Sequence, residues 1–563
     1  MRRSRILWAI LPLLAAPAAR AVPTRPAEGP ASRSAARPPA APTTRPQTRP
    51  SAADLARQRI EKARKIAGIN QRLLRLFAAE KYDRCQPLLG QILEIDPNNS
   101  VAWYNLACVH SRLGREGKAI ECLNTAVEHG YSAFRHLERD PDLDALRELP
   151  GYKELLARKD EIHRQRAAKI RDQLRERFGA DYLYEIDHER KLVFATNVDR
   201  TTLEEMKQRL TAYASAQWED LFTHPFEGYL TIVIPKSSDW RWGPAVGGFY
   251  TRAGHILFAR TVGLTLVHEF THALHAADQE GLGQQHPIWI TEGLATLFES
   301  SKVADGHAVP QPNRRLNLLQ VLLQRKRTIP LAEFVRYDRG KFMGAASTAY
   351  AEGRYVMMYL HDKGLLRKWY DAYTAGFDDD PTGGKAMEKV LGKKLGEIEK
   401  DWRQWAASLD APALRLPARH AYLGVQLRQD IDGVRIGHIE PGSGADKSDL
   451  RAGDVILALD GERTLDAGQL MEIVLGHEVD DEVAVRYRRD GKYATTTVRL
   501  GAMPQRLSAQ GPGTRPAPAP RPGHTPKPQV QPTPKPGHDP EPKPKPKAIP
   551  KPPATQPATR KAA

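Results

Sequence analysis

The residues best suited to chemistry lie in one short segment, 268–272, which reads His-Glu-Phe-Thr-His. If this segment is helical, His268 and His272 lie one turn apart on the same face. Two neutral imidazoles at this spacing can bind one tetrahedral Zn²⁺. Glu269 then stands beside the metal, where a general base takes a proton from metal-bound water. The segment therefore predicts a catalytic zinc site.

A third protein ligand is needed if the fourth zinc position is to hold water. Glu292 is the first candidate, because 19 residues separate it from His272 and it lies in a short helical pattern of its own. His286, in a loop before a proline, is the second candidate. The longer pattern HExxHxxGxxH is absent, because position 275 is His and position 278 is Asp.

The surroundings of the motif are apolar. Residues 262–270 carry no polar side chain except Thr265 and the motif itself, which predicts a buried helix. Histidine and glutamate are costly to bury unless a metal ion or hydrogen bonds satisfy them. The alternative to a metal site is a structural histidine pair in a helical core.

With the downstream glutamate, the motif resembles that of the gluzincins, the thermolysin-like zinc metallopeptidases, over residues 183–407. The resemblance implies an α+β zincin-type domain that hydrolyses peptide bonds. It also implies a tyrosine or histidine that stabilises the oxyanion, for which Tyr350 is the first candidate and Tyr355 the second. Either could instead be an ordinary core or surface tyrosine. Thr296 stands where thermolysin has a carboxylate that orients a ligand histidine, so the groups behind the ligands must differ.

The elements that precede the motif read as a sheet with one helix. Residues 191–196 and 229–234 have strand patterns, and residues 201–222 between them have the pattern of an amphipathic helix. Residues 247–250 and 255–260 read as a hairpin that ends just before the motif. By the gluzincin resemblance, 255–260 is the edge strand expected to pair with an extended peptide substrate.

The N-terminus has the features of a secretory signal peptide over residues 1–21. Three arginines within residues 2–5 precede an apolar run at 6–16, and Ala-Arg-Ala at 19–21 fits a cleavage site. The mature chain is expected to begin at Val22 and to be exported to the periplasm, the cell surface or the medium. An uncleaved signal that serves as an anchor is the alternative.

The net charge of +17 lies mainly at the two ends of the chain. Residues 1–52 and 511–563 each carry a net charge of +8, so the middle of the chain is nearly neutral. A basic nucleic-acid-binding protein is therefore not expected. The basic ends are expected to be disordered tethers, or to contact an anionic surface.

A helical region with a period of 34 residues is expected at 53–178. Trp103, with small and apolar residues at 106, 107, 114, 119, 123 and 126, resembles a tetratricopeptide repeat, and a weaker copy precedes it. Such repeats imply either a protein-binding module or a plain scaffold. The three cysteines all lie in this region, match no zinc pattern, and are expected to pack as small apolar residues.

Residues 418–502 strongly resemble a PDZ domain of the bacterial type. The resemblance rests on Tyr422-Leu423-Gly424-Val425, on a short helix at 467–475 and on an alternating strand at 482–488. In that family the loop presents backbone N–H groups to the C-terminal carboxylate of a peptide, which adds to the sheet as a strand. A role as a rigid spacer is the alternative.

The sequence thus predicts a multidomain, exported, zinc-dependent metallopeptidase with one Zn²⁺ per chain, whose protein substrates are positioned by the repeats and the PDZ domain. The alternative is a non-catalytic protein-binding scaffold with a structural zinc site. The expected segments are a signal peptide (1–21), a disordered linker (22–52), tetratricopeptide-like helices (53–178), the metallopeptidase domain (180–410), the PDZ domain (418–502) and a disordered Pro/Lys-rich tail (504–563).

Overall fold

The structure is a computed structural model that describes residues 52–243, 246–412 and 420–503. The predicted signal peptide, residues 22–51 of the predicted linker and the predicted tail lie outside these residues. Among the described helices, none is both long enough and apolar enough to cross a membrane.

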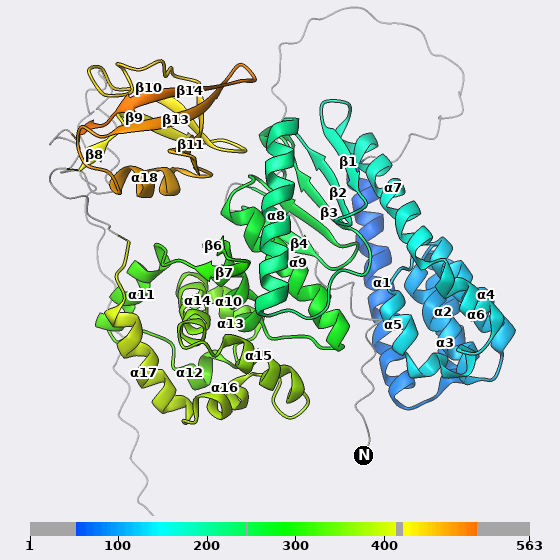
Figure 1. The fold of residues 1–563 in the computed structure, drawn as a ribbon. Coiled ribbons are helices and arrows are strands. Elements are labelled where there is room, and N and C mark those ends of the chain that lie inside the picture. The colour runs from blue at the N-terminus through cyan, green and yellow to red at the C-terminus, as the bar shows by residue number, and fades with distance from the viewer. Residues whose placement is uncertain (1–51, 244–245, 413–419, 504–563) are drawn as a thin grey trace, which may run out of the picture. The chain divides into compact units, whose positions relative to one another are not determined.

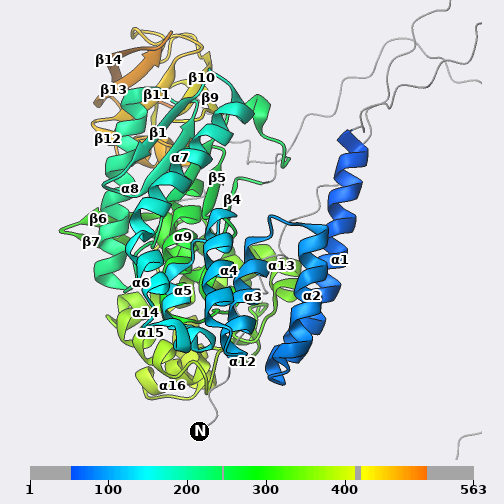
Figure 2. The same cartoon turned by 90° about the vertical axis from the view of Figure 1, so that its right-hand side faces the viewer.

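The N-terminal part consists of helices, as the 34-residue period predicts (Figures 1 and 2). Tyr104, Leu123 and Phe134 are fully buried where α3, α4 and α5 pack together. The cysteines Cys85, Cys108 and Cys122 are buried and free, as expected for small apolar residues. The elements are α1 (Ala52–Ala78), α2 (Tyr82–Ile95), α3 (Ser100–Arg112), α4 (Glu116–Glu128), α5 (Phe134–Arg139), η2 (Pro141–Leu146), α6 (Pro150–Ala157) and α7 (Lys159–Phe178).

A five-stranded mixed sheet follows, with the strand order β1-β2-β3-β5-β4. Its strands alternate their side chains between two apolar layers: Phe194 and Ile232 pack in the main core with α8 and α9, whereas Ala195 and Val233 pack with Leu174 of α7. The elements are β1 (Leu183–Asp187), β2 (Leu192–Thr196), α8 (Arg200–Asp220), β3 (Leu230–Ile234), η3 (Ser237–Asp239), β4 (Gly248–Thr251) and β5 (Ile256–Ala259).

The predicted hairpin at 247–260 is confirmed, but the predicted edge strand is wrong. Strand β5, which corresponds to the predicted edge at 255–260, lies inside the sheet, parallel to β3 and antiparallel to β4. Strand β4 is the edge instead. The chain passes from β3 to the outer strand β4 first, and the hairpin then returns it to β5 beside β3. The hairpin pattern in the sequence does not show which of its two strands lies outside.

The rest of the middle part is mostly helical, and it also contains a short hairpin, β6–β7, that the sequence analysis did not predict. Trp289, Tyr355 and Trp369 are buried in the same core as the sheet. The elements are α9 (Leu264–Leu282), α10 (Ile288–Glu299), β6 (Ser301–Ala304), β7 (His307–Pro310), α11 (Arg315–Gln324), α12 (Leu331–Phe334), α13 (Arg339–Gly344), α14 (Ala346–Asp362), α15 (Leu366–Ala375), α16 (Gly384–Leu391) and α17 (Leu395–Ser408).

The C-terminal part is a small β-rich unit with one helix. Its sheet has the order β14-β13-β11-β10-β9, with β12 paired to β11, while β15 pairs with β8. The predicted helix at 467–475 and the predicted strand at 482–488 are both present. The elements are β8 (Ala421–Tyr422), β9 (Val425–Gln429), β10 (Val434–Ile439), β11 (Val455–Leu459), β12 (Glu462–Arg463), α18 (Ala467–Leu475), β13 (Glu482–Arg489), β14 (Lys492–Arg499) and β15 (Gly501–Ala502).

Glu352 of α14 makes the stability of the middle part depend on pH. Its side chain is 1% exposed, and burial raises its pKa to about 8. The unfolded chain releases this proton near the ordinary pKa, so stability falls as pH rises from about 4.5 to about 8. Glu352→Gln should therefore raise the melting temperature more at pH 8 than at pH 5, because the amide cannot ionise and can still accept the hydrogen bond from Ile329 N–H.

The matched control is Glu176→Gln, which changes an exposed glutamate of α7. Thermal unfolding at both pH values checks the prediction. An equal change in melting temperature at pH 5 and pH 8 would contradict it.

Candidate functional site

Helices α9 and α10 carry the motif residues. Helix α9 ends at Gly283, whose left-handed backbone forms the C-cap, and α10 begins after Pro287. The helices pack against each other, and their apolar sides enter the main core. This packing brings the predicted third ligand, Glu292 on α10, next to the two motif histidines on α9.

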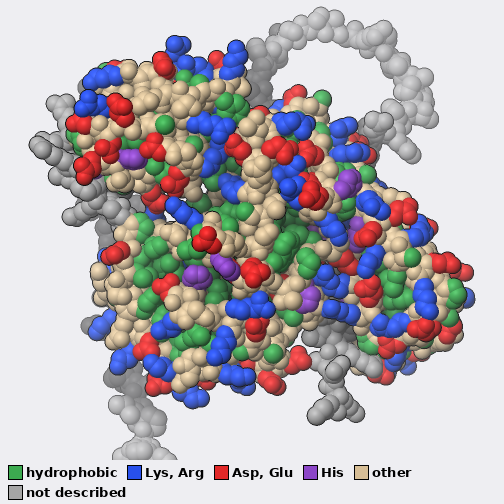
Figure 3. Space-filling model, viewed as in Figure 1, with side chains coloured by type: hydrophobic (Ala, Val, Ile, Leu, Met, Phe, Trp, Pro, Cys, Tyr) green, Lys and Arg blue, Asp and Glu red, His purple; other side chains and the backbone are tan. Residues whose placement is uncertain are grey.

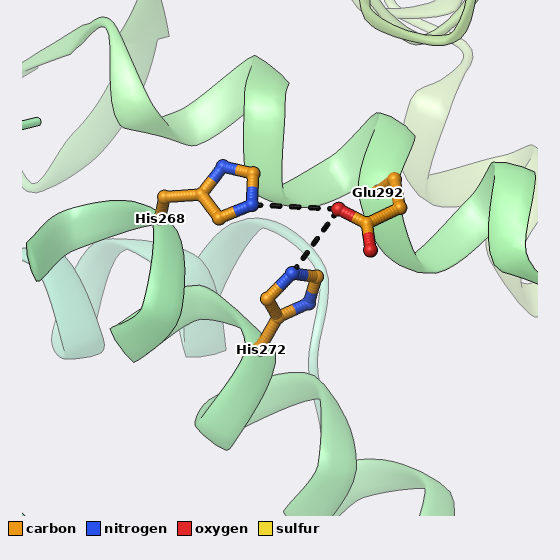
Figure 4. Close-up of side chains that lie close together, drawn as sticks. All are labelled: His268, His272 and Glu292. Carbon is orange, nitrogen blue, oxygen red and sulfur yellow. Dashed lines mark ion pairs between the residues drawn. The ribbon is translucent and has the colours of Figure 1, made fainter. Parts of the chain in front are cut away.

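His268, His272 and Glu292 converge on one point (Figure 4). The Oε2 atom of Glu292 lies 3.4 Å from His268 Nε2 and 3.3 Å from His272 Nε2. Ligand atoms about 2.0–2.1 Å from a tetrahedral metal ion are about 3.3–3.4 Å apart, so these two distances suit such an ion. Glu292 Oε2 is buried and has no hydrogen-bond partner among the described residues. The donor set therefore fits a divalent cation.

Glu269 lies on the same helix and is 7% exposed. Burial raises its pKa, as does the negative charge of Glu292, while His272 and His268 act in the opposite direction. Its carboxylate also accepts a hydrogen bond from the backbone N–H of Tyr250 on the edge strand β4. A buried carboxylate with a raised pKa is suited to accept and return a proton near neutral pH.

Of the two candidate tyrosines, only Tyr350 lies at this site. Its ring centroid is 6.5 Å from that of His268, and burial together with the negative charge of Glu292 raises the pKa of its hydroxyl. The phenol therefore stays protonated and can donate a hydrogen bond. Tyr355 is buried elsewhere, where its hydroxyl donates to the carbonyl of Asn313.

Glu299 is a residue of the site that the sequence analysis missed. Its Oε2 lies 2.8 Å from Nδ1 of His268, and its Oε1 accepts hydrogen bonds from Arg315 at 3.0–3.1 Å. This arrangement places the proton of His268 on Nδ1 and leaves Nε2 free to face Glu292. Thr296 instead donates to the backbone carbonyl of Glu292. Glu299 could have been found seven residues after Glu292, on the same face of the helix.

The remaining histidines near the motif form a separate buried pair. Nε2 of His275 lies 2.8 Å from Nδ1 of His286, and Nε2 of His286 lies 3.0 Å from Oε1 of Gln284. Burial lowers the pKa of both imidazoles, so both are neutral. The structure therefore groups Glu292, and not His286, with the two motif histidines.

A cavity of about 320 Å³ opens beside the cluster, and Figure 3 shows histidine side chains next to acidic ones in the middle of one face. Among the described residues, no serine or cysteine lines it. The strand β4 borders it closely, because a Cβ atom at Gly248 would lie 2.9 Å from Cγ of Glu269. The lining residues are Gly248, Phe249, Tyr250, Arg252, His268, Glu269, His272, His275, Ala276, Gln279, Thr291, Glu292, Arg339 and Tyr350.

The loop predicted to bind peptides lies between β8 and β9. Gly424 has φ +85°, and a Cβ atom there would lie 2.1 Å from Ser443, so only glycine fits. Leu423 is buried, and its carbonyl accepts a hydrogen bond from Ala445 N–H. Tyr422 ends β8, and Val425 begins β9. The loop thus has a fixed backbone at the entry to β9.

Two family models match parts of the chain: the PDZ domain at residues 421–500 and the tetratricopeptide repeat at residues 88–121. Both predicted modules are therefore present. A chloroplastic protein of Arabidopsis thaliana is 39% identical over 84 residues, which is 14% of this chain and 25% of that protein.

Two further relatives are proteases. A probable periplasmic serine endoprotease DegP-like of Marinomonas sp. is 37% identical over 73 residues, 13% of this chain and 16% of that protein. The serine protease Do-like HtrA of Lactococcus lactis is 28% identical over 119 residues, 21% of this chain and 26% of that protein. The chain spans about a quarter or less of the length of these relatives.

These comparisons contradict the prediction of a gluzincin-type, zinc-dependent metallopeptidase. The two proteases just named are serine proteases, a class that uses an activated hydroxyl and needs no zinc. The predicted Zn²⁺ cofactor is contradicted with it, and the scaffold with a structural zinc site is not favoured either. The similarity to these relatives covers at most 21% of this chain.

The close approach of β4 to α9 can be tested with Gly248→Ala. The added Cβ atom would lie 2.7 Å from the carbonyl oxygen of Phe258 and 2.8 Å from Cγ2 of Thr265. We expect the free energy of unfolding to fall by about 1–3 kcal/mol, because the strand or the helix must shift.

Urea denaturation measures this loss. The control is Gly396→Ala in α17, where a Cβ atom meets nothing within 4 Å and a helical position favours alanine. If Gly248→Ala is as stable as the control, position 248 has room for a Cβ atom and the close approach of β4 to α9 is contradicted.

Proposed function

We propose that this chain binds extended peptide segments of proteins and hydrolyses peptide bonds in the cavity beside β4. The observation that carries the proposal is the meeting of a free sheet edge with a buried, proton-accepting carboxylate. Among the described residues, strand β4 has a partner strand on one side only, and three of its four residues line the cavity that contains Glu269. The proteases among the relatives support an action on peptide bonds.

The free edge of β4 accounts for peptide binding without a demand for one sequence. An added strand pairs through its backbone N–H and C=O groups, which every peptide offers. The backbone N–H of Tyr250 lies close enough to Glu269 to lower the pKa of its carboxyl, so the strand and the carboxylate are neighbours. A peptide paired to β4 would therefore place its backbone near Glu269.

Several side chains have proposed roles in this cavity. Glu269 takes a proton from the attacking water and returns it to the leaving amine. Tyr350 donates a hydrogen bond to the oxyanion of the tetrahedral intermediate. His268, His272 and Glu292 bind a divalent cation, whose charge would stabilise negative charge that develops in the cavity.

The other modules supply partners in this proposal. The loop Tyr422-Leu423-Gly424-Val425 receives the C-terminal carboxylate of a peptide at its backbone N–H groups, and the peptide then pairs with β9. The tetratricopeptide helices bind a protein partner. Export from the cytoplasm fits the predicted signal peptide and the periplasmic relative.

The first test is hydrolysis of an unfolded protein, such as casein, by the full chain and by Glu269→Gln. We expect hydrolysis by the full chain and a loss of about 10²–10⁴-fold in the variant, because glutamine cannot take the proton. The control is Glu280→Gln, which changes an exposed glutamate at the end of the same helix and outside the cavity lining.

A serine-directed reagent shows whether the activity depends on a serine nucleophile. A serine-directed phosphonate should leave the activity intact, because no serine lines the cavity among the described residues. Equal activity of Glu269→Gln and the full chain, or loss of activity with the phosphonate, would contradict the proposed site.

The second test concerns the cation. The metal content of the purified chain, measured by plasma mass spectrometry, should be about one divalent ion per chain. His272→Ala should lower it at least several-fold, because one of three ligands is lost. His307→Ala, which changes an exposed histidine outside the cluster, should leave the metal content unchanged. No bound metal in any of the three proteins would contradict the cation site.

A further inference from the structure

Two arginines line the cavity and have no partner of opposite charge in the part of the chain that the structure describes. Arg252 and Arg339 are both part of its wall. Within the described residues, neither guanidinium makes an ion pair or a side-chain hydrogen bond. Arg315, which is not part of the cavity lining, is different, because it is paired with Glu299. The two cavity arginines are therefore available to a ligand.

The two glutamates that line the cavity do not form ion pairs with these arginines. Glu292 lies against His268 and His272, and Glu269 lies against the backbone of Tyr250. A guanidinium offers five N–H donors in a planar fork that matches a carboxylate. An arginine that lines a substrate cavity and has no internal carboxylate is well suited to bind one from the substrate.

Arg252 lies next to the edge strand β4, and Arg339 lines the same cavity. Arg252 directly follows the last residue of that strand and is half-buried. Its positive charge adds to burial in lowering the pKa of His275 and His286, so the guanidinium lies near this buried histidine pair. Arg339 is exposed and begins α13, after its N-cap Asp338.

We propose that Arg252 and Arg339 form an anionic subsite, which selects peptide substrates that present a carboxylate to this end of β4. The inference rests on the proposed function and adds a substrate class to it. The carboxylate comes either from an acidic side chain or from the C-terminus of the peptide. Both sources present the same group to the two guanidinium forks.

The test compares short peptides that differ in one group. The first comparison uses a series of peptide pairs, and the two members of each pair differ by Glu or Gln at one position. All these peptides are C-terminally amidated, so that they offer no C-terminal carboxylate to the PDZ loop. The second pair is a neutral peptide with a free or an amidated C-terminus. We expect a ratio of kcat/KM of about tenfold or more in favour of the carboxylate in at least one pair, which identifies its source.

Variants of the full chain then assign the preference to the arginines. Arg252→Ala and Arg339→Ala should each reduce this ratio, and the double variant should bring it close to one. Arg252→Lys, which keeps the charge but not the fork, should retain part of it. The control is Arg336→Ala, which changes an exposed arginine outside the cavity lining and should keep the full ratio.

The outcomes separate this inference from the proposed function. Hydrolysis without a charge preference, or with a preference that the double variant keeps, overturns the anionic subsite and leaves the hydrolase proposal standing. If no peptide is cleaved, the hydrolase proposal fails, and the binding of the amidated peptides to Glu269→Gln decides the subsite. Tighter binding of the Glu peptide that is lost with Arg252→Ala supports it, and equal binding of both peptides overturns it.

Discussion

The burial of ionisable side chains between two apolar helices is the constraint on which the middle of this protein depends. His268, Glu269 and Glu292 lie on α9 and α10, whose other faces enter the main core. A buried charge without a partner costs several kcal/mol, so these groups must satisfy one another or bind an ion. Glu299 is the hydrogen-bond partner of His268 Nδ1. The backbone N–H of Tyr250 stabilises the charged form of Glu269.

The edge strand β4 and the polar cluster line the same cavity. Strand β4 runs so close to α9 that only glycine fits at position 248. Its outer side is unpaired, and its neighbour Arg252 has no internal partner among the described residues. The fold thus places a backbone that can accept a strand, a buried carboxylate and unpaired positive charge around one cavity.

The spacing of residues along the helices allowed the cluster to be predicted from the sequence. The groups behind the cluster and the order of the strands beside it could not be predicted in this way. His268 and His272 had to share a face, and Glu292 met them because a second short helix packs on the first. Glu299 was missed although it follows Glu292 by seven residues on the same helix face, because its contact with His268 depends on how α10 packs against α9. The strand order was mispredicted, since the hairpin pattern does not say which strand lies outside. The motif residues alone did not identify the class of protease either, and the relatives contradict the predicted zinc metallopeptidase.

The most direct measurement is a crystal structure of Glu269→Gln with a C-terminally amidated peptide that carries acidic residues. The amide prevents the peptide from offering a C-terminal carboxylate to the PDZ loop. The proposal predicts the peptide as an added strand on the free side of β4, with a peptide carbonyl in the cavity beside residue 269. A peptide bound only elsewhere, with the edge of β4 and the cavity empty at saturating concentration, would contradict it.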